Sequence, residues 1–238
     1  MQLQNSLDSL RSKIPMTLIQ FKNVTKTYGS GDSTFRALKG LNLAIEDGEF
    51  LALMGPSGSG KSTTMNIAAC LDTLTSGSYL FQNVPVENLN TYQRTLLRRN
   101  FLGFIFQGFN LLPRSSALEN VELPLIYRGD KVLERRSAAN AALEKVGLSN
   151  WRNHTPSELS GGQQQRVAIA RAIVTKPKIL LADEPTGNLD SQTSEEIMSL
   201  LTSLNRDLGI TVIMVTHEPQ MAEYASRVVH FLDGQITN

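Results

Sequence analysis

The nine residues "GPSGSGKST", from Gly55 to Thr63, carry the types and spacing that can hold a phosphate group. They match a pattern of glycine, four residues and then Gly60-Lys61-Ser62, which is typical of phosphate-binding loops between a strand and a helix. Glycines let backbone amides curl around an anion, and the positive end of the following helix points at it. The stretch predicts a nucleotide phosphate site made by Gly55, Pro56, Ser57, Gly58, Ser59, Gly60, Lys61, Ser62 and Thr63.

Within this loop, Lys61 supplies a point charge for the outer phosphates, and the hydroxyl of Ser62 suits Mg²⁺. The alternative is an ordinary turn rich in glycine and serine. The strand-like "EFLALMG" before the loop and the helix-like "KSTTMNIAACL" after it favour the phosphate site, because the motif requires that context.

A phosphate loop needs an acidic element that holds a metal ion and orders water. The stretch "KILLADEP" supplies it, because an apolar strand ends in Asp183 and Glu184 follows directly. Asp183 is placed to reach Mg²⁺ through its water shell, and Glu184 to act as the base that polarises the attacking water. A plain charged turn is the alternative, but the phosphate loop upstream favours the catalytic interpretation. Together the two elements predict a nucleotide hydrolase.

A second glycine-rich stretch, "ELSGGQQQR", leads into the helix-like "VAIARAIV". Gly161 and Gly162 allow a close approach to the backbone, and the following helix points its N-terminus at any anion bound there. Ser160 also fits a helix N-cap, and this structural role is compatible with anion binding.

Strand-like and helix-like segments alternate along the chain and must position these residues. The middle, from about Asn90 to Leu148, is mostly helical, with "FLGFIFQ" as the one clear strand-like interruption. Strands alternating with helices predict a largely parallel sheet covered by helices. The expected strands are 17–24, 37–45, 49–55, 75–81, 101–107, 178–182, 210–217 and 227–234, and the expected helices outside the middle are 61–71, 191–209 and 219–225.

The motif "LSGGQ", together with the phosphate loop and "LLADEP" in this order, resembles the signature of ABC ATPases. The resemblance extends from Leu18 to the C-terminus. It implies an α/β fold, the P-loop NTPase of ABC ATPase type, with a mainly parallel sheet core flanked by helices, an antiparallel β part and a helical subdomain inserted at roughly 90–160. The ATPase domain is expected over 16–238, with ATP and Mg²⁺ as cofactors. Residues 1–15 form either a short amphipathic helix or a leader.

The resemblance implies roles for further single residues. Gln107, after "FLGFIF", matches the glutamine that touches the metal and water and joins the catalytic core to the helical subdomain. His217, at the end of "VIMVTH", matches the histidine that contacts the γ-phosphate and orders a catalytic pair with Glu184. Tyr28, in "VTKTYG", matches the aromatic residue that stacks on adenine. Without the family context, Gln107 would be unremarkable and a histidine at a strand end is more often structural. A tyrosine just after a strand is then either a stacking platform or an ordinary strand-end residue.

Two ABC ATPase domains of the resembled type dimerise head to tail. The segment from Ser160 to Gln163, including Gly161 and Gly162, is then expected to cap the γ-phosphate held by the other copy's phosphate loop. Asp190, in "GNLD", matches the loop that crosses the dimer interface. The common family wording there is "SALD", so Asn188 is a departure from the pattern.

The wording around these motifs, such as "ALENVELPLIYRG" and "DEPTGNLDSQT", is similar to the ATPases of the macrolide-export and lipoprotein-release group. The resemblance implies an exporter ATPase that drives a separate integral membrane permease subunit, with a possible periplasmic adaptor. It places the chain in the cytoplasm, peripheral on the inner face of the cell membrane. A short coupling helix of the permease is expected to dock in the groove beside Gln107 and the helical subdomain, near Arg98, Phe101, Phe109 and Leu111.

Two alternatives to an exporter remain open. In the first, the ATPase signals to a membrane partner, as the cell-division members of the wider group do, and moves no substrate. In the second, the chain is a binding module without hydrolysis, against which the presence of Lys61, Asp183, Glu184 and His217 argues. The sequence does not identify the cargo, because the partner subunits contact it in this architecture.

Composition excludes other classes of function. A formal net charge of +1, from 23 basic and 22 acidic residues, gives no case for a nucleic-acid partner. No apolar run approaches the ~18 residues that cross a bilayer, so the chain is not expected to be a channel. The sole cysteine, Cys70, is expected to be a small buried hydrophobe. Three residues match no catalytic element and are expected to be surface or packing residues: Trp151, His154 and His230.

Overall fold

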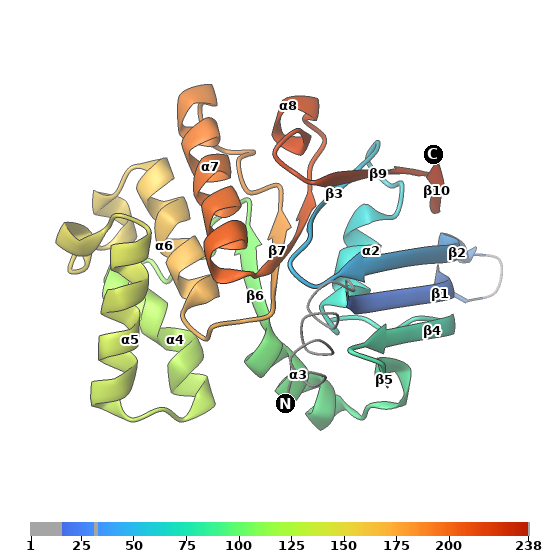
Figure 1. The fold of residues 1–238 in the computed structure, drawn as a ribbon, viewed down its shortest axis with the longest axis horizontal. Coiled ribbons are helices and arrows are strands. Elements are labelled where there is room, and N and C mark those ends of the chain that lie inside the picture. Colours follow the sequence, from blue (N-terminus) through green and yellow to red (C-terminus); the bar gives the residue numbers. More distant parts are fainter. Residues whose placement is uncertain (1–15, 31–32, 238) are drawn as a thin grey trace, which may run out of the picture.

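The computed structural model describes residues 16–30 and 33–237, so the expected leader, 1–15, lies outside the described residues. A six-stranded sheet crosses the middle of the molecule (Figure 1). Five of its strands are parallel, and only the last strand of the chain runs antiparallel, against its neighbour. In spatial order they are β10 (Gln235–Thr237), β9 (Arg227–Leu232), β3 (Phe50–Met54), β8 (Thr211–Val215), β7 (Ile179–Asp183) and β6 (Leu102–Phe106).

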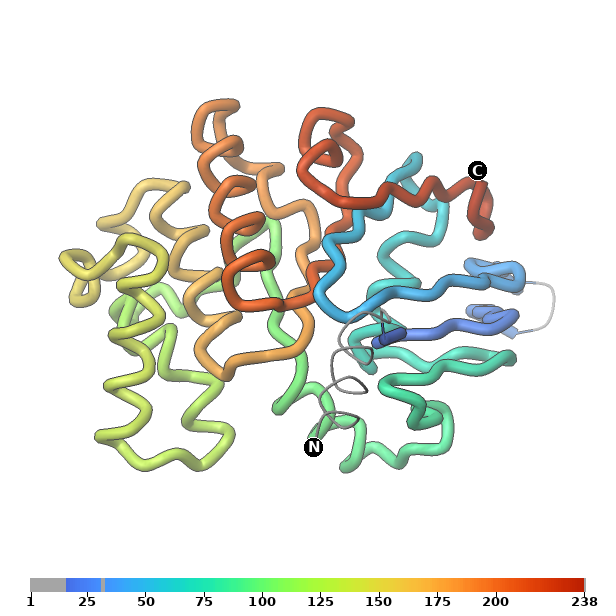
Figure 2. The backbone as a smooth tube through the Cα atoms, in the orientation of Figure 1, coloured from blue at the N-terminus to red at the C-terminus, as the bar shows by residue number. Residues whose placement is uncertain are grey.

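A second, antiparallel sheet of four strands lies at the opposite end of the molecule from helices α4 and α5 (Figure 1). The C-terminal strand β10 lies beside β2 of this sheet, where the backbone amide of Lys39 donates to the carbonyl of Gly234 at 2.9 Å (Figure 2). The strands, in spatial order, are β2 (Phe35–Glu46), β1 (Thr17–Tyr28), β4 (Ser76–Phe81) and β5 (Val84–Pro85).

Helices cover both faces of the six-stranded sheet, and the strand pattern explains why. Successive side chains of β8 point to opposite faces, and all five are buried, as expected for a parallel strand covered on both sides. One face packs on α4 to α8, and the other on α2, α3 and the four-stranded sheet. The helices are α2 (Lys61–Ala68), α3 (Thr91–Phe101), α4 (Ala117–Arg128), α5 (Val132–Lys145), α6 (Gly161–Ile173), α7 (Ser191–Leu208) and α8 (Pro219–Ala222).

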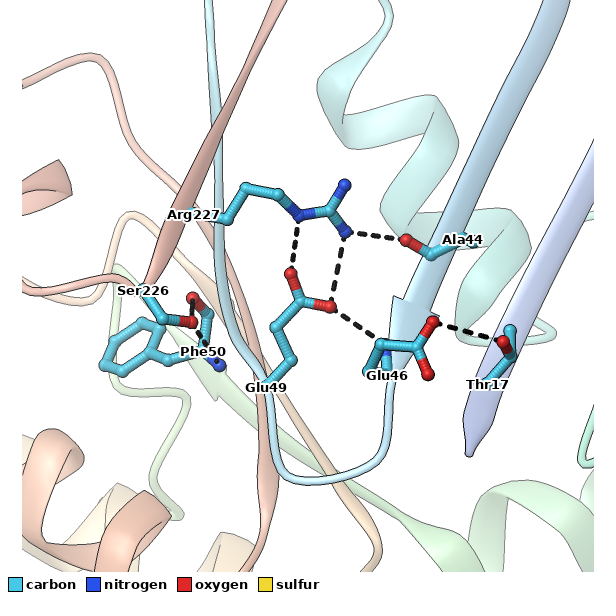
Figure 3. Close-up of polar contacts among 7 residues, drawn as sticks. All are labelled: Thr17, Ala44, Glu46, Glu49, Phe50, Ser226 and Arg227. Carbon is cyan, nitrogen blue, oxygen red and sulfur yellow. Dashed lines mark hydrogen bonds and ion pairs between the residues drawn. The ribbon is translucent and has the colours of Figure 1, made fainter. Parts of the chain in front are cut away.

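A polar network joins the two sheets at one corner (Figure 3). The guanidinium of Arg227, at the start of β9, donates to both carboxylate oxygens of Glu49, at 2.6 and 3.2 Å, and to the carbonyl of Ala44 on β2 at 2.6 Å. Glu49 also accepts from the amide of Glu46 at 2.8 Å, and Glu46 accepts from the hydroxyl of Thr17 at 3.1 Å. The bidentate pair has a defined geometry, so it holds the start of β9 beside β2 at this corner.

The predicted alternation of strands and helices and the α/β fold class are confirmed. The two strands that sequence patterns did not indicate, β5 and β10, have only two and three residues, too few for a visible alternation. The segment expected as an inserted helical subdomain, 90–160, contains α3, α4 and α5, but also β6, which pairs with β7 as the last strand of the six-stranded sheet.

Candidate active site

A cavity of about 500 Å³ lies at the C-terminal end of β3, where the glycine-rich loop connects this strand to α2. Ligands of open parallel sheets bind at this end of the strands. The cavity is lined by the nine residues 55–63, by Glu184 and His217, and by Phe35, Ala37 and Val215. The structure therefore brings the predicted phosphate loop together with the two predicted catalytic residues.

The loop can take only glycine at two of its turns. Gly55 has a φ of 147°, and a Cβ atom there would lie 2.2 Å from the carbonyl oxygen of Phe231. Gly60 has a φ of 107°, and a Cβ atom there would lie 2.9 Å from the carbonyl oxygen of Ala37. Both contacts are with backbone that cannot move away, so the glycines are required by the path of the loop itself.

The start of α2 offers donors to the cavity. Gly60 is the N-cap of this helix, and no side chain caps the first turn. Lys61 is 7% exposed, and its ammonium donates to the carbonyls of Gly55 and Pro56 at 2.7 and 2.8 Å. Burial lowers the pKa of Lys61, and the charges of Glu184 and Asp183 partly oppose this. A cation held beside an uncapped helix start fits a phosphate group.

The acidic pair lies at the end of β7, and of its two residues only Glu184 lines the cavity. Asp183 ends β7, and Glu184 follows with a left-handed φ of 46°. Its amide donates to the carbonyl of Val215 at 2.9 Å, and its carboxylate oxygen Oε1 lies 3.1 Å from Nδ1 of His217. A left-handed glutamate costs about 1–2 kcal/mol. Neighbouring strand β8 holds the residue in this conformation, and the side chain is thereby aimed at His217.

Two carboxylates so close together favour a cation beside them. Burial raises the pKa of Asp183, the neighbouring Glu184 raises it further, and Lys61 lowers it. Among the described residues there is no cluster of three or more His, Cys, Asp and Glu side chains that could hold a metal ion. Carboxylate, hydroxyl and amide oxygens are the kinds of donor that suit Mg²⁺.

Gln107 and Asn188 join the loop after β6 to the loop before α7. The side-chain amide of Asn188 donates to the carbonyl of Gln107 at 2.9 Å, and the amide of Gln107 lies 3.5 Å from the side-chain oxygen of Asn188. A Cβ atom at Gly187 would lie 2.6 Å from this amide, so Gly187 allows the close approach. Asn188, which departs from the common family pattern, thus has a structural role. Neither Gln107 nor Asn188 lines the cavity.

Asp190 is the N-cap of α7. Its carboxylate accepts from the amide of Thr193 at 2.9 Å and from the hydroxyl of Thr193 at 2.7 Å. These hydrogen bonds lower the pKa of Asp190. The residue is exposed and does not line the cavity.

The second glycine-rich stretch forms the start of α6. The hydroxyl of Ser160 accepts from the amide of Gln163 at 3.2 Å, and the side-chain oxygen of Gln163 accepts from the amide of Ser160 at 2.9 Å, which is a complete capping box. Ser160 is exposed, and none of Ser160, Gly161, Gly162 and Gln163 lines the phosphate cavity. One chain therefore carries the phosphate loop and this helix start at two separate places.

Tyr28 ends β1 and is 39% exposed. It does not line the phosphate cavity, but its partner in the β1–β2 register, Phe35, does. Phe35 is 58% exposed and was not among the predicted site residues. Its only sequence signal is a large aromatic residue at the start of a strand, in "STFRAL".

The sequence model of a family described as "ABC transporter" matches residues 38–187, more than half of the chain. The chain belongs to this family. With the phosphate loop and the Glu184–His217 pair in one cavity, it is an ABC-type ATPase.

Curated relatives of this ABC ATPase include both separate subunits and fused proteins. It is 52% identical over 219 residues to the ABC transporter ATP-binding protein YknY of Bacillus subtilis, covering 92% of this chain and 95% of the relative. It is 51% identical over 223 residues to a macrolide export ATP-binding/permease protein of Syntrophobacter fumaroxidans. That match covers 93% of this chain, and the chain spans only 31% of the relative's length.

Solved structures agree with the fold. The dimeric, ADP- and phosphate-bound structure of the ATP-binding cassette MJ0796 of Methanocaldococcus jannaschii superimposes with a TM-score of 0.84. It is 48% identical in sequence to this ABC ATPase, and the match covers 92% of this chain and 97% of the other. The predicted family and fold type are therefore confirmed.

A groove of about 640 Å³ lies on the ABC ATPase between α3, β6, α4 and α6. Of the four residues predicted at a docking site there, only Arg98 lines it. The ring of Phe101 instead packs against Phe81, with 5.5 Å between ring centroids, and Leu111 packs against the buried cluster of α4 to α8. Phe109 uses its carbonyl to accept from Arg171 at 2.8 Å. The residues that line this groove and were not predicted include Arg99, Phe104, Phe106, Leu123 and Tyr127.

The remaining predicted residues have structural surroundings. Cys70 is buried, and burial raises the pKa of its thiol to about 11. Trp151 and His154 pack on each other with ring centroids 4.8 Å apart, and His230 is exposed on β9. Within residues 16–30 and 33–237, no helix has both the length and the apolar character needed to cross a bilayer.

Proposed function

We propose that this chain is the ATP-binding and hydrolysing subunit of an ABC exporter, which works as a head-to-tail dimer and drives a separate membrane subunit of the macrolide-export type. One observation carries the proposal. The Glu184–His217 pair lines the phosphate cavity, while the glycine-rich start of α6 from Ser160 lies outside it. A second copy can bring that helix start to the phosphates.

In the proposed reaction, the loop amides and Lys61 hold the β- and γ-phosphates of ATP. Glu184 accepts a proton from the water that attacks the γ-phosphorus, as the bond to the β,γ-bridging oxygen breaks to leave ADP and phosphate. His217, with Nδ1 3.1 Å from Glu184, orients that carboxylate and reaches the γ-phosphate. Tyr28 stacks on the adenine.

Three oxygen donors would hold Mg²⁺ beside these phosphates. They are the hydroxyl of Ser62, the carboxylate of Asp183 through water, and the side-chain oxygen of Gln107. The ion would supply positive charge to the phosphate oxygens. The pKa of Asp183 is raised, first by burial and then by the charge of Glu184, and a bound cation would oppose both effects.

A head-to-tail dimer is supported by how α6 begins. The capping box of Ser160 and Gln163 preforms the first turn. Gly161 and Gly162 are the first two residues of α6, so their amides have no acceptor within the helix, and we propose that they bind the γ-phosphate of a second copy. Asp190 lies on the neighbouring loop and would contact the second copy. The related cassette MJ0796 is described as dimeric.

The membrane subunit would dock in the groove between α3, β6, α4 and α6. The lining of this groove is largely apolar and includes three basic residues, Arg98, Arg99 and Arg171. In this proposal, residues 90–160 form a helical subdomain that is inserted in a single ATPase domain over 16–238. The chain would then lie in the cytoplasm, on the inner face of the cell membrane, with a periplasmic adaptor as a further component. The fused permease of the Syntrophobacter relative supports this arrangement.

The variant Glu184→Gln tests the catalytic assignment. Turnover should fall about 100-fold or more because the base is lost, while ATP binding is retained because the phosphate loop is intact. Size-exclusion chromatography with ATP should then show a stable dimer. Glu223→Gln, at an exposed glutamate on the end of α8, is the matched control. Turnover of Glu184→Gln at the parental rate would reject the assignment.

Export itself is tested on the complex that copurifies from the native membrane. Stimulation of its ATPase activity by a candidate cargo supports an exporter. ATPase activity that ignores every cargo but responds to an envelope protein supports the signalling alternative.

A further inference from the structure

The hydroxyl of Tyr28 is held by a residue far along the chain. It donates to a carboxylate oxygen of Asp72 at 2.7 Å. The other oxygen of Asp72 accepts from the ammonium of Lys26 at 2.6 Å and from the amide of Thr73 at 2.7 Å. One carboxylate therefore holds two side chains of β1 at once.

The ring of Tyr28 has one face covered. The ammonium of Lys26 lies 4.7 Å from the ring centroid, as in a cation–π pair. Lys26 is only 8% exposed and also donates to the carbonyl of Thr73 at 2.7 Å, so its position is fixed. A flat ligand is left with the other face of the ring.

Asp72 is itself rigidly attached to the phosphate-binding helix. The amides of Leu71 and Asp72 donate to the carbonyl of Asn66, in the last turns of α2, at 2.9 and 3.2 Å. The other end of α2 starts at the phosphate loop, with Lys61 as its first residue. The eight-residue helix is thus a spacer between the phosphate cradle and the carboxylate that holds Tyr28.

We infer that Asp72 is a positioning residue for nucleotide recognition: it orients the Tyr28 ring and, through α2, sets its distance from the phosphate loop. The inference rests on the proposed role of Tyr28 in adenine stacking. A ring oriented before ATP arrives loses less side-chain entropy on binding, so Asp72 raises affinity without touching the nucleotide.

The ionisation of the pair agrees with this arrangement. The pKa of Tyr28 is raised, first by burial and then by the hydrogen bond to Asp72. Burial raises the pKa of Asp72, but the hydrogen bonds from Lys26, Tyr28 and Thr73 together outweigh this effect and lower it. Near neutral pH the phenol is therefore the donor and the carboxylate the acceptor.

The first test compares ATP with a ligand that has no base. Asp72→Ala should raise the KM for ATP about three- to tenfold with kcat at saturation unchanged. The inhibition constant of inorganic tripolyphosphate, which needs only the phosphate loop, should stay the same. Asp130→Ala removes a carboxylate from another ion pair, with Arg128, and serves as the control that changes neither constant. Equal weakening of ATP and tripolyphosphate in Asp72→Ala would overturn the inference, because Asp72 would then act on the phosphate loop.

The second test uses Tyr28, where substitutions leave the Lys26–Asp72 pair in place. Tyr28→Phe keeps the ring but removes the hydroxyl, and it should raise the KM in the same direction as Asp72→Ala. In a Tyr28→Ala background, Asp72→Ala should add no further loss, because the two residues act as a unit. Normal ATP affinity in Tyr28→Ala would reject the stacking role itself. Weakened affinity in Tyr28→Ala with normal affinity in both Tyr28→Phe and Asp72→Ala would reject only the inference about Asp72.

Discussion

The chain has two glycine-rich helix starts, and they are built in opposite ways. At α2 the N-cap is Gly60, with a φ of 107° and no side-chain cap. At α6 the N-cap is Ser160, in an extended conformation, with a reciprocal capping box to Gln163. The first start lies inside a cavity beside a buried lysine, whereas at the second Ser160 is exposed and no residue from 160 to 163 lines that cavity.

The difference teaches which helix start needs a ligand to be complete. At α2 the free amides have no protein acceptor among the side chains at the cap, so a phosphate can take the place of the cap. At α6 the cap already satisfies two amides, so the helix start is formed before any partner arrives. A preformed start suits a surface that must be presented to a second molecule, because little ordering remains to be done on binding.

The largest effect is expected from a substitution of Gly60, the N-cap of α2. Gly60→Ala places a Cβ atom at 2.9 Å from both the Ala37 carbonyl and the Leu38 side chain, at a left-handed φ. The loop must shift, and ATP affinity measured by calorimetry should fall about 100-fold or more, since several phosphate contacts depend on its path.

The control for this change is Gly129→Ala, at the end of α4. Gly129 has a similar left-handed φ of 88°, but a Cβ atom there meets nothing within 4 Å. It should lose about 1 kcal/mol of folding stability and keep its ATP affinity. Equal ATP affinity in both variants would show that the path of the loop at Gly60 does not matter for binding.

The second helix start is tested by removing its cap. Ser160→Ala and Ser116→Ala each destroy one capping box, the second at the start of α4. Both should lose about 1 kcal/mol of unfolding free energy. Only Ser160→Ala should lower turnover, by about tenfold or more, because its helix start meets the phosphate in the proposed dimer. Monomer ATP affinity should be unchanged in both. Equal turnover in the two variants would contradict the assignment of this start to the active site.

Both helix starts could be predicted from the sequence, because both are local motifs. Residues 55–63 and the Ser160–Gln163 stretch form local motifs whose chemistry depends on neighbours in the chain, and the strands that precede or follow them show clear periodicity. The sequence therefore predicted the α/β fold and the phosphate loop. The pairing of Glu184 with His217 was predicted through the family resemblance.

What the sequence did not predict depends on contacts between distant segments. Phe35 joins the cavity because β2 pairs with β1, and Asp72 reaches Tyr28 across 44 positions. Phe101 and Leu111 were expected at a docking groove, yet their apolar side chains are used by the core instead. An apolar residue on a helix end fits either place by type, and only the packing of the whole molecule decides.

A substitution at Asn188, in the loop between β7 and α7, should have a smaller effect. Asn188→Ala restores the common family residue and removes the 2.9 Å hydrogen bond to the Gln107 carbonyl. Turnover should fall about two- to fivefold, because Gln107 is held less firmly, with folding stability changed by less than about 0.5 kcal/mol. Asn140→Ala, which loses a 2.8 Å bond to the Arg136 carbonyl within α5, should leave turnover unchanged. Steady-state ATPase assays compare the two, and equal rates would show that Asn188 has no part in positioning.

The smallest expected effect concerns the charge of the Asp183 carboxylate. The pKa of Asp183 is raised in the folded chain, mainly by burial and also by Glu184. The stability contributed by Asp183 is therefore full below the ordinary aspartate pKa and is lost as the pH rises through the raised value. Without nucleotide at neutral pH, Asp183→Asn should raise the Tm by about 1–3 °C, and the gain should vanish in acid. With Mg²⁺ and ATP the order should reverse, because ligand binding stabilises the parent more. A gain independent of pH would mean that the ionised carboxylate is not the cause.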